Sequence, residues 1–473
     1  MPELLFHFHD LPCECSFDAF KLIIEMKTKT TFLISTVVLL ALLLPLKNNA
    51  QETDTTLWSL TRCIDYAHQQ NIDVRSSMLN IKTSEVSFDQ AKSQKLPSVN
   101  GSVSQNFSWL KGEDATGAST GYSGNSNNNY QVSSAVLLSN GYKLTNRVKQ
   151  AELDLQSVKF NSEAIKENIS LQILNSFLQV LYAEEQVKNA MKQIESTTEQ
   201  LALANERLTL SIISKSDYLQ VKSELASEKL TLANAKSNFE IARISLMQLM
   251  ELPVNTAFDI VRPDLEKELN QARTPDAQSV YETALGIKPQ VKSAEINAES
   301  ALFDEKIAKA DFYPSVNLNA GLGTGYTSAF TNSTYFNQLE NSISPSVGLS
   351  VSIPIFQKNQ VKNNVKLAQI GIESAELNQI NIKNQLRKSI EQACTDVNSA
   401  QEQYEAGKEK YTATEESYLL AEEKFKNGLI NSIDFLVIKN SLILAESDLL
   451  QSKYNLVFSY KILDFYAGVP ISL

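Results

Sequence analysis

Hydrophobic residues recur every seven positions through two long tracts of the chain. The first tract, residues 142–252, contains neither Gly nor Pro, the residues that most often end a helix. Its seven-residue series is Val180, Val187, Ile194, Leu201 and Leu208, with Ala183, Ala190, Thr197 and Ala204 between them. The second tract, residues 359–467, has the series Val397, Tyr404, Tyr411, Tyr418 and Phe425, with Ala400, Gly407, Thr414 and Ala421 between them. This period predicts long helical hairpins with a closely packed coiled-coil seam, and an ordinary antiparallel coiled coil fits it equally well.

Four shorter segments alternate apolar and polar residues with a period of two, at residues 98–109, 130–138, 315–326 and 346–353. The alternation predicts strands that have one apolar and one polar face. The stretches between them, residues 111–129 and 327–344, are rich in Gly, Ser and Asn and predict exposed loops. Strands of this length with aromatic residues near one end are typical of a transmembrane β-barrel, and a soluble β-sandwich is the alternative.

The whole pattern occurs twice in the chain. Pro97-Ser98-Val99-Asn100 recurs 217 residues later as Pro314-Ser315-Val316-Asn317, and the same offset relates Asp217 to Asp434 and Lys222 to Lys439. Self-similarity over such a length indicates repeated structural units. The sequence therefore predicts repeat one at residues 51–260 and repeat two at residues 261–473. Each consists of a helix, a pair of strands and a long helical hairpin, at residues 142–252 in repeat one and 359–467 in repeat two.

Residues 1–50 predict an export signal behind a spurious N-terminal extension. From Met26 onward, Lys27 and Lys29 supply the basic start of the signal, residues 32–46 its apolar core, and residues 48–50 a cleavage site. The apolar core is shorter than the roughly 20 residues that a membrane-spanning helix needs, so we expect cleavage rather than anchoring. We expect Met26 to be the true start of the protein.

The remaining chain is acidic and poor in cysteine. After residue 50 its net charge is −10, and Lys and Arg form no blocks, which argues against a nucleic-acid partner. An acidic channel would favour cations, although solubility alone also explains the charge. Cys63 and Cys394 are the cysteines of this part and occupy non-equivalent positions in the two repeats, so we expect buried free thiols rather than a disulfide.

Four strands are too few for one chain to close a membrane barrel. About eight strands are the minimum, and lipid tolerates no open sheet edge, so several chains must share one barrel. Two copies would supply eight strands and three copies twelve, and the wider barrel leaves room for a solute path. The long helices, at roughly 95 Å, are far longer than a bilayer is thick and must project out of it.

At this point the residues resemble a known family, the outer-membrane efflux proteins of the TolC-like type. Residues 425–436 read FKNGLINSIDFL, which is similar to the family's turn at the periplasmic tip, aromatic-x-x-Gly-x-x-x-Ser/Thr-x-Asp-x-Leu. Residues 208–219 of repeat one read LTLSIISKSDYL and carry Ser211 where the family prefers Gly. The resemblance implies a mainly α-helical fold with a membrane β-barrel part. It further implies a homotrimer with a twelve-stranded β-barrel that is continued by a periplasmic α-helical barrel.

The resemblance also implies function and partners. It implies a passive exit duct in the bacterial outer membrane that serves a tripartite efflux pump or a type I secretion system. The duct would dock onto a periplasmic adaptor of an inner-membrane pump, which supplies the energy, and would contact outer-membrane lipid. We expect drug-like small molecules as cargo, although metal efflux and protein secretion use similar conduits.

The family pattern identifies a candidate gate and a candidate docking tip. Asp434 matches a position where threefold symmetry gathers carboxylates at the periplasmic entrance, and Asp217 is its counterpart in repeat one. The alternative is helix capping by Asn431 or Ser432, with the aspartate in the first helical turn. Val437 stands where the family has a second aspartate. The residues expected to contact the adaptor are Asn427, Gly428, Leu429, Leu210, Ser211 and Ile212.

No catalytic, metal or cofactor site is predicted. His68 is the one histidine after the signal, and nothing near it in sequence supplies a metal ligand or a triad partner. Two competing functions remain open. A soluble periplasmic coiled-coil scaffold or adaptor leaves the apolar strand faces unexplained, and a helical pore-forming toxin would be released from the cell and lyse its target.

Overall fold

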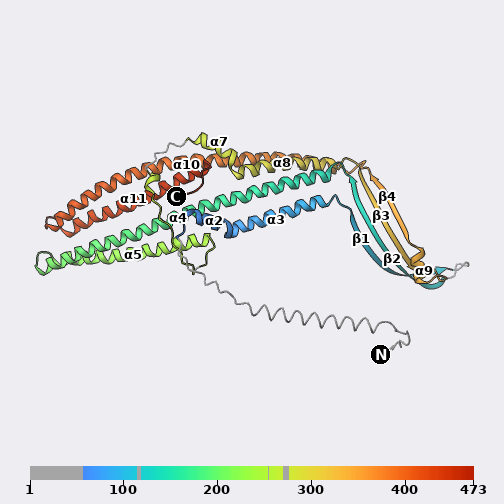
Figure 1. Ribbon diagram of the computed structural model, residues 1–473, viewed down its shortest axis with the longest axis horizontal. Coiled ribbons are helices and arrows are strands. Elements are labelled where there is room, and N and C mark those ends of the chain that lie inside the picture. The colour runs from blue at the N-terminus through green and yellow to red at the C-terminus, as the bar shows by residue number, and fades with distance from the viewer. Residues whose placement is uncertain (1–56, 114–118, 254, 270–275) are drawn as a thin grey trace, which may run out of the picture. The chain divides into compact units, whose positions relative to one another are not determined.

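The computed structural model describes residues 57–113, 119–253, 255–269 and 276–473 (Figure 1). The predicted export signal, its cleavage site and the start at Met26 lie outside the described residues. The helices are α2 Leu60–Gln70, α3 Ile72–Ser93, α4 Lys143–Thr209, α5 Lys215–Leu249, α6 Glu266–Leu269, α7 Ala277–Ile287, α8 Pro289–Ala310, α9 Tyr335–Asn341, α10 Gln360–Lys426 and α11 Ser432–Tyr466. The strands are β1 Ser98–Glu113, β2 Ser119–Ser139, β3 Ser315–Thr327 and β4 Ser344–Ser352.

Two long helical hairpins dominate the fold. Helices α4 and α10 have 67 residues each, and they pack against α5 and α11 respectively (Figure 1). The seam predicted for the first hairpin is confirmed, because Ala183, Ala190, Thr197 and Ala204 are all buried. In the second hairpin, a Cβ atom at Gly407 would lie 3.2 Å from Ser452 Oγ of α11, so a small residue permits the close approach there. Within the described part of the chain, no helix is both long and apolar enough to cross a membrane.

The four strands form one antiparallel sheet in chain order, β1-β2-β3-β4 (Figure 1). Both hairpins keep the same register: Ser98 lies opposite Ala135, and 217 residues later Ser315 lies opposite Ser352. Because side chains alternate across a strand, the apolar positions of all four strands fall on one face of the sheet. This apolar face is exposed, and it includes Val99, Val103, Val132, Leu322, Val347, Leu349 and Val351.

The strands differ from prediction mainly in the stretches expected to be loops. Strand β2 begins at Ser119 instead of residue 130, and β1 continues to Glu113, so most of residues 111–129 is strand. Residues 125–129 pair with β1 on one side, and Asn127–Asn129 also pair with β3. Backbone pairing on two sides outweighs the low strand preference of Asn and Gly. The second expected loop, residues 327–344, contains the short helix α9, which begins at Thr334 as its N-cap.

The helices of the two repeats pack side by side. Helix α8 of repeat two contacts α4 of repeat one as well as α10 of its own repeat, whereas α3 contacts α4 and α2. The main hydrophobic core likewise draws on both repeats, with Cys63 from α2, Phe177 from α4, Leu246 from α5 and Val457 from α11. The repeats therefore fold as one unit within residues 57–473.

Candidate functional site

The two long hairpins end in turns of the same geometry. After α4, Ile212 N donates to Arg207 O at 2.8 Å, and Ser211 has a φ of +55°. After α10, Leu429 N donates to Lys424 O at 2.8 Å, and Gly428 has a φ of +73°. A left-handed residue closed by such a bond is a Schellman ending, which suits glycine and costs a residue with a Cβ atom about 1–2 kcal/mol. The departure of Ser211 from the family pattern therefore leaves the turn intact.

Both aspartates of the expected gate occupy the first turn of a returning helix. Asn431 is the N-cap of α11, since its side-chain oxygen accepts from Asp434 N at 2.8 Å. Ser214 is the N-cap of α5 and forms a capping box with Asp217, in which Asp217 N donates to Ser214 Oγ at 3.1 Å and Ser214 N donates to Asp217 Oδ2 at 3.1 Å. Ser214 Oγ also donates to Asp217 Oδ2 at 2.7 Å. Capping thus accounts for an aspartate at this position in both repeats.

The surroundings of the two aspartates differ beyond the cap. Asp217 is half-buried, and its Oδ1 accepts a hydrogen bond from Ser432 Oγ of the other hairpin at 2.8 Å. The hydrogen bonds from Ser214 and Ser432 lower the pKa of Asp217 below its ordinary value. Asp434 is exposed and accepts from Asn431 Nδ2 at 3.0 Å. The carboxylate of Asp217 is engaged between the hairpins, whereas that of Asp434 faces solvent.

Arg207 is a second link between the two tips, and sequence reasoning missed it. Its guanidinium donates to Phe425 O at 2.8 Å and to Lys426 O, the last carbonyls of α10, and lies 5.6 Å from the Phe425 ring centroid. A cation at a helix C-terminus interacts favourably with the helix dipole and satisfies carbonyls that lack partners within the helix. The available signal was a basic residue in the last turn of both α4 and α10, where the offset relates Arg207 to Lys424.

The residues of the expected docking tip are exposed. Leu210, Ile212 and Leu429 are 64–73% exposed, and Asn427 and Ser211 are exposed as well. A Cβ atom at Gly428 would meet nothing within 4 Å, so the glycine is required by its φ and leaves open space beside the turn.

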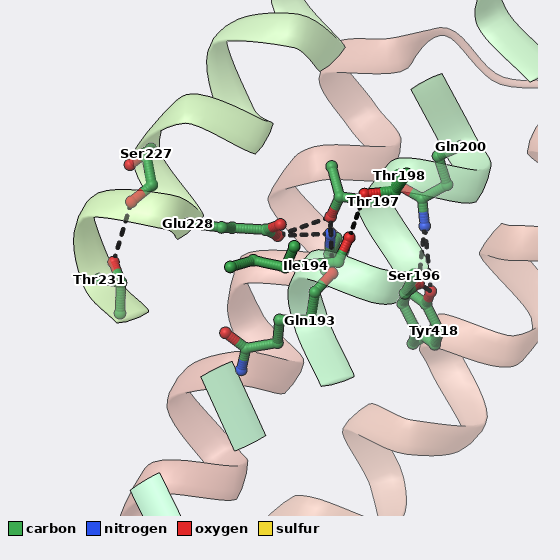
Figure 2. A network of polar contacts seen from close by, with 11 residues as sticks. Gln193, Ile194, Ser196, Thr197, Thr198, Gln200, Ser227, Glu228, Thr231 and Tyr418 are labelled. Atoms are coloured by element: carbon green, nitrogen blue, oxygen red, sulfur yellow. Dashed lines mark hydrogen bonds and ion pairs between the residues drawn. The ribbon is translucent and has the colours of Figure 1, made fainter. Parts of the chain in front are cut away.

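A buried polar network lies further along the hairpins (Figure 2). Lys439 Nζ of α11 donates to Glu228 Oε1 of α5 at 2.7 Å and also to Thr197 Oγ1 of α4, and Thr197 Oγ1 donates to Glu228 Oε1 at 2.7 Å. Lys439, Glu228 and Thr197 are 3%, 4% and 0% exposed. Close by, Gln200 Nε2 donates to Tyr418 Oη at 3.3 Å (Figure 2). The contacts among Lys439, Glu228 and Thr197 join α11, α5 and α4, and therefore both repeats.

Other reactive groups serve packing. His68 Nε2 is 2.8 Å from Ser170 Oγ and 3.2 Å from Lys166 O, so the histidine of α2 forms polar contacts with α4. Cys63 and Cys394 are free and buried, as predicted, and burial raises the pKa of Cys63 to about 12 and also raises that of Cys394. Among the described residues, no group of three His, Cys, Asp or Glu side chains is arranged to hold a metal ion.

Comparison with known proteins accounts for this architecture. The family model for the outer membrane efflux protein matches residues 63–251 and again residues 280–469, one match per repeat. The chain belongs to the outer membrane efflux protein family. Outer membrane efflux proteins are non-enzymatic conduits, and in general they act as homotrimers together with an adaptor and an inner-membrane pump.

Solved channel structures share the fold of this outer membrane efflux protein. CusC matches with a TM-score of 0.75 at 16% identity, over 87% of this chain and 92% of CusC. The Campylobacter jejuni CmeC outer membrane channel matches with a TM-score of 0.73 at 17% identity, over 86% of this chain and 85% of CmeC. The open state of the Neisseria gonorrhoeae MtrE outer membrane channel matches with a TM-score of 0.71 at 18% identity, over 87% and 88% of the two chains.

A curated relative matches over a shorter part of this efflux protein. An uncharacterized protein of Haemophilus influenzae (strain ATCC 51907 / DSM 11121 / KW20 / Rd) is 31% identical over 153 residues. The match covers 32% of this chain and 32% of the relative, so the chain spans about a third of the length of that protein.

Proposed function

We propose that this chain is the outer-membrane exit duct of a tripartite export system. Three copies share one twelve-stranded β-barrel in the membrane and continue it as a tunnel of helices through the periplasm. The duct is a passive conduit and not an enzyme, and the partner pump supplies the energy. The observation that carries the proposal concerns the contacts between the two repeats, in which α4 packs on α8 and β2 pairs with β3. The counterpart contacts, α10 with α3 and β4 with β1, are not made within the described residues of one chain.

The helices support a closed ring of three copies. Helix α4 of repeat one packs on α8 of repeat two, and the offset relates α4 to α10 and α8 to α3. The matching contact would join α10 to α3 of another copy. Both helices expose apolar stripes at helical spacing, which are Leu367, Ile370, Leu377 and Ile380 on α10 and Ile72, Leu79 and Val86 on α3. Such unpaired stripes are typical of a surface that another subunit covers.

The sheet supports the same ring. Strand β2 of repeat one pairs with β3 of repeat two, so the matching pair is β4 with β1 of a second copy. The register follows from the offset. Ser133 lies opposite Gly321, and the offset carries Ser133 to Ser350 and Gly321 back to Ser104. Ser350 of one copy is therefore expected to lie opposite Ser104 of the next.

Cysteine crosslinking tests this register directly. In a variant with Ser104→Cys and Ser350→Cys, oxidation of outer-membrane fractions is expected to give covalent dimers and trimers on a denaturing gel. Residues that lie opposite each other in neighbouring antiparallel strands have Cα atoms about 4.5–5.5 Å apart, which is within the range of Cα separations that a disulfide can bridge. The native cysteines are buried with raised pKa values and do not compete.

The matched control moves one cysteine by a single residue. In the pair Ser104→Cys and Leu349→Cys, the second cysteine lies on the opposite face of β4, so covalent trimers are not expected. A soluble protein that crosslinks with neither pair would overturn the shared barrel and favour a coiled-coil scaffold.

The polar face of the sheet supports small solutes as cargo. Asn100, Ser102, Ser104, Asn317 and Asn319 alternate with the apolar positions and would line the barrel interior. These side chains are uncharged, so a water-filled lumen that they line selects little by charge. We propose that selection of cargo takes place in the pump and not in this duct.

The exposed tips support docking to a periplasmic adaptor. Leu210, Ile212 and Leu429 place apolar side chains in solvent at both turns, and Asn427, Gly428 and Ser211 lie beside them. Apolar groups that are held rigidly at a helical turn suit a partner that presents its own helical tip. We assign these six residues as the adaptor contact.

The two aspartates are proposed as parts of the closed entrance with different roles. In planar bilayers, Asp434→Asn is expected to weaken cation selectivity, because three exposed carboxylates near the threefold axis are removed. Asp217→Asn is the matched variant: it disturbs the contact with Ser432, so it is expected to raise resting conductance while it changes selectivity less. Reversal potentials in a salt gradient and single-channel conductance measure the two effects. Unchanged selectivity in Asp434→Asn would leave that residue with a capping role.

A further inference from the structure

The short helix α9 packs onto the apolar face of the sheet and not onto the polar face. Tyr335 Oη lies 2.7 Å from Tyr130 Oη, and the Tyr335 ring centroid lies 4.8 Å from that of Tyr326. Thr324 Oγ1 donates to Leu339 O of the same helix. Tyr130 is opposite Thr324 in the sheet, and both alternate in step with the apolar positions of their strands, such as Val132 and Leu322.

Exposed aromatic side chains gather at the same end of the sheet. We call them the aromatic collar, and its members are Phe107, Trp109, Tyr122, Phe330 and Phe336, which are 60–77% exposed. Phe107, Trp109 and Tyr122 lie on the apolar faces of β1 and β2, near the end of β1 and the start of β2. Phe330 and Phe336 come from the connection between β3 and β4, which contains α9.

The connection between β3 and β4 carries almost no charge. In residues 327–344, Glu340 is the one Asp or Glu and there is no Lys or Arg. Recognition of a lipid phosphate relies on Arg and Lys, which this segment lacks. Aromatic rings are instead enriched where acyl chains meet the headgroup region of a membrane, and the long side chain of a lysine can reach the headgroups from there. Lys111, which lies opposite Tyr122, is such a lysine on β1.

We propose that α9 and the aromatic collar form a lipid-facing rim that sits in the acyl-chain boundary of the outer leaflet, and that α9 does not cover the channel mouth. This inference rests on the proposed function, because the apolar sheet face must be the lipid-facing side of a barrel. The rim is continuous with that face through Tyr130, Tyr326 and Tyr335. It would fix the depth of the barrel in the membrane.

Fluorescence quenching by brominated lipid tests the rim. The chain has two tryptophans, Trp58 and Trp109, so a Trp58→Phe, Trp109→Phe background allows a single probe at Phe336→Trp. The protein is reconstituted into phosphatidylcholine vesicles brominated either near the glycerol or near the end of the acyl chains. We expect a loss of Phe336→Trp emission with bromine near the glycerol and little loss with bromine at the chain end.

Two neighbouring positions on β4 serve as controls. Leu349→Trp lies on the apolar face and is expected to lose emission to both kinds of vesicle, whereas Ser350→Trp lies on the polar face and is expected to lose none. If Leu349→Trp is quenched and Phe336→Trp is not, the rim is wrong and the barrel stands. If Leu349→Trp is not quenched, the proposed barrel fails and the rim fails with it.

Discussion

Replacing Glu228 by Ala is expected to destabilise the protein strongly. The substitution leaves Lys439 with its Nζ buried and without a carboxylate partner. Loss of one member of a buried ion pair costs about 3–5 kcal/mol, because the remaining charge is removed from water without compensation. Denaturant titration of the detergent-purified protein, followed by circular dichroism, measures the change in unfolding free energy.

The repeat supplies a control for this prediction. Lys222 is the repeat-one counterpart of Lys439 and is exposed, so Lys222→Met is expected to change stability by less than about 0.5 kcal/mol. Lys439→Met is expected to destabilise strongly. If Lys222→Met and Lys439→Met change the unfolding free energy equally, the buried ion pair does not have the effect on stability that is expected here.

The double substitution Glu228→Leu with Lys439→Met has the opposite expectation. It removes both charges, and a well-packed apolar pair of similar volume is often as stable as the ion pair or more so. Glu228 Oε2 and Gln200 Oε1 are buried without a hydrogen-bond partner among the described residues. Burial of these oxygens lowers the net contribution of the native network to the free energy of unfolding. We therefore expect the ion pair to contribute specificity of the packing between the two hairpins rather than net stability, and a large loss of stability in the double variant would contradict this.

Elements in which one hydrophobic pattern repeats over many residues were predictable from sequence. The run without Gly or Pro at residues 142–252 placed the hairpin α4–α5 within a few residues of its ends. The seven-residue series at residues 180–208 and 397–425 indicated the packed faces of α4 and α10, because each series repeats the same packing signal at five positions. The alternation of apolar residues placed β1 and β3 for the same reason. The start of β2 was wrong because Asn and Gly carry no such signal, and the partner strands decide their conformation.

Contacts between the repeats were not predictable from sequence. The offset relates Lys439 to Lys222, yet Lys439 is buried in an ion pair and Lys222 is exposed. Lys439 is buried because α11 packs against α4 and α5. Lys222 has no equivalent partner at the offset position, since the counterpart of Glu228 is the buried Ala445. Asp217 and Asp434 are likewise equivalent in sequence but differ in contacts. Helix α9 was missed because seven residues are too few to show a helical period.

The two connections between a strand and a long helix, one in each repeat, have the same backbone conformation but different neighbouring residues. Gly141 and Tyr142 have φ values of +65° and +66°, and their counterparts Lys358 and Asn359 have +51° and +59°. Two consecutive left-handed residues turn the chain from strand to helix in both repeats. A residue with a Cβ atom is accepted at 358, so the left-handed backbone alone does not demand glycine at 141.

Gly141→Ala is therefore expected to destabilise through its neighbours as well as its backbone. A Cβ atom there would lie 2.8 Å from Tyr313 Cβ and 2.9 Å from Ala310 O, at the end of α8 in the other repeat. Overpacking against such fixed atoms, together with the left-handed φ, costs about 2–5 kcal/mol. Lys358→Ala keeps a Cβ atom in the same conformation and is expected to change little. Denaturant titration compares the two, and an equal cost would show that the packing of α8 against this joint is looser than its geometry implies.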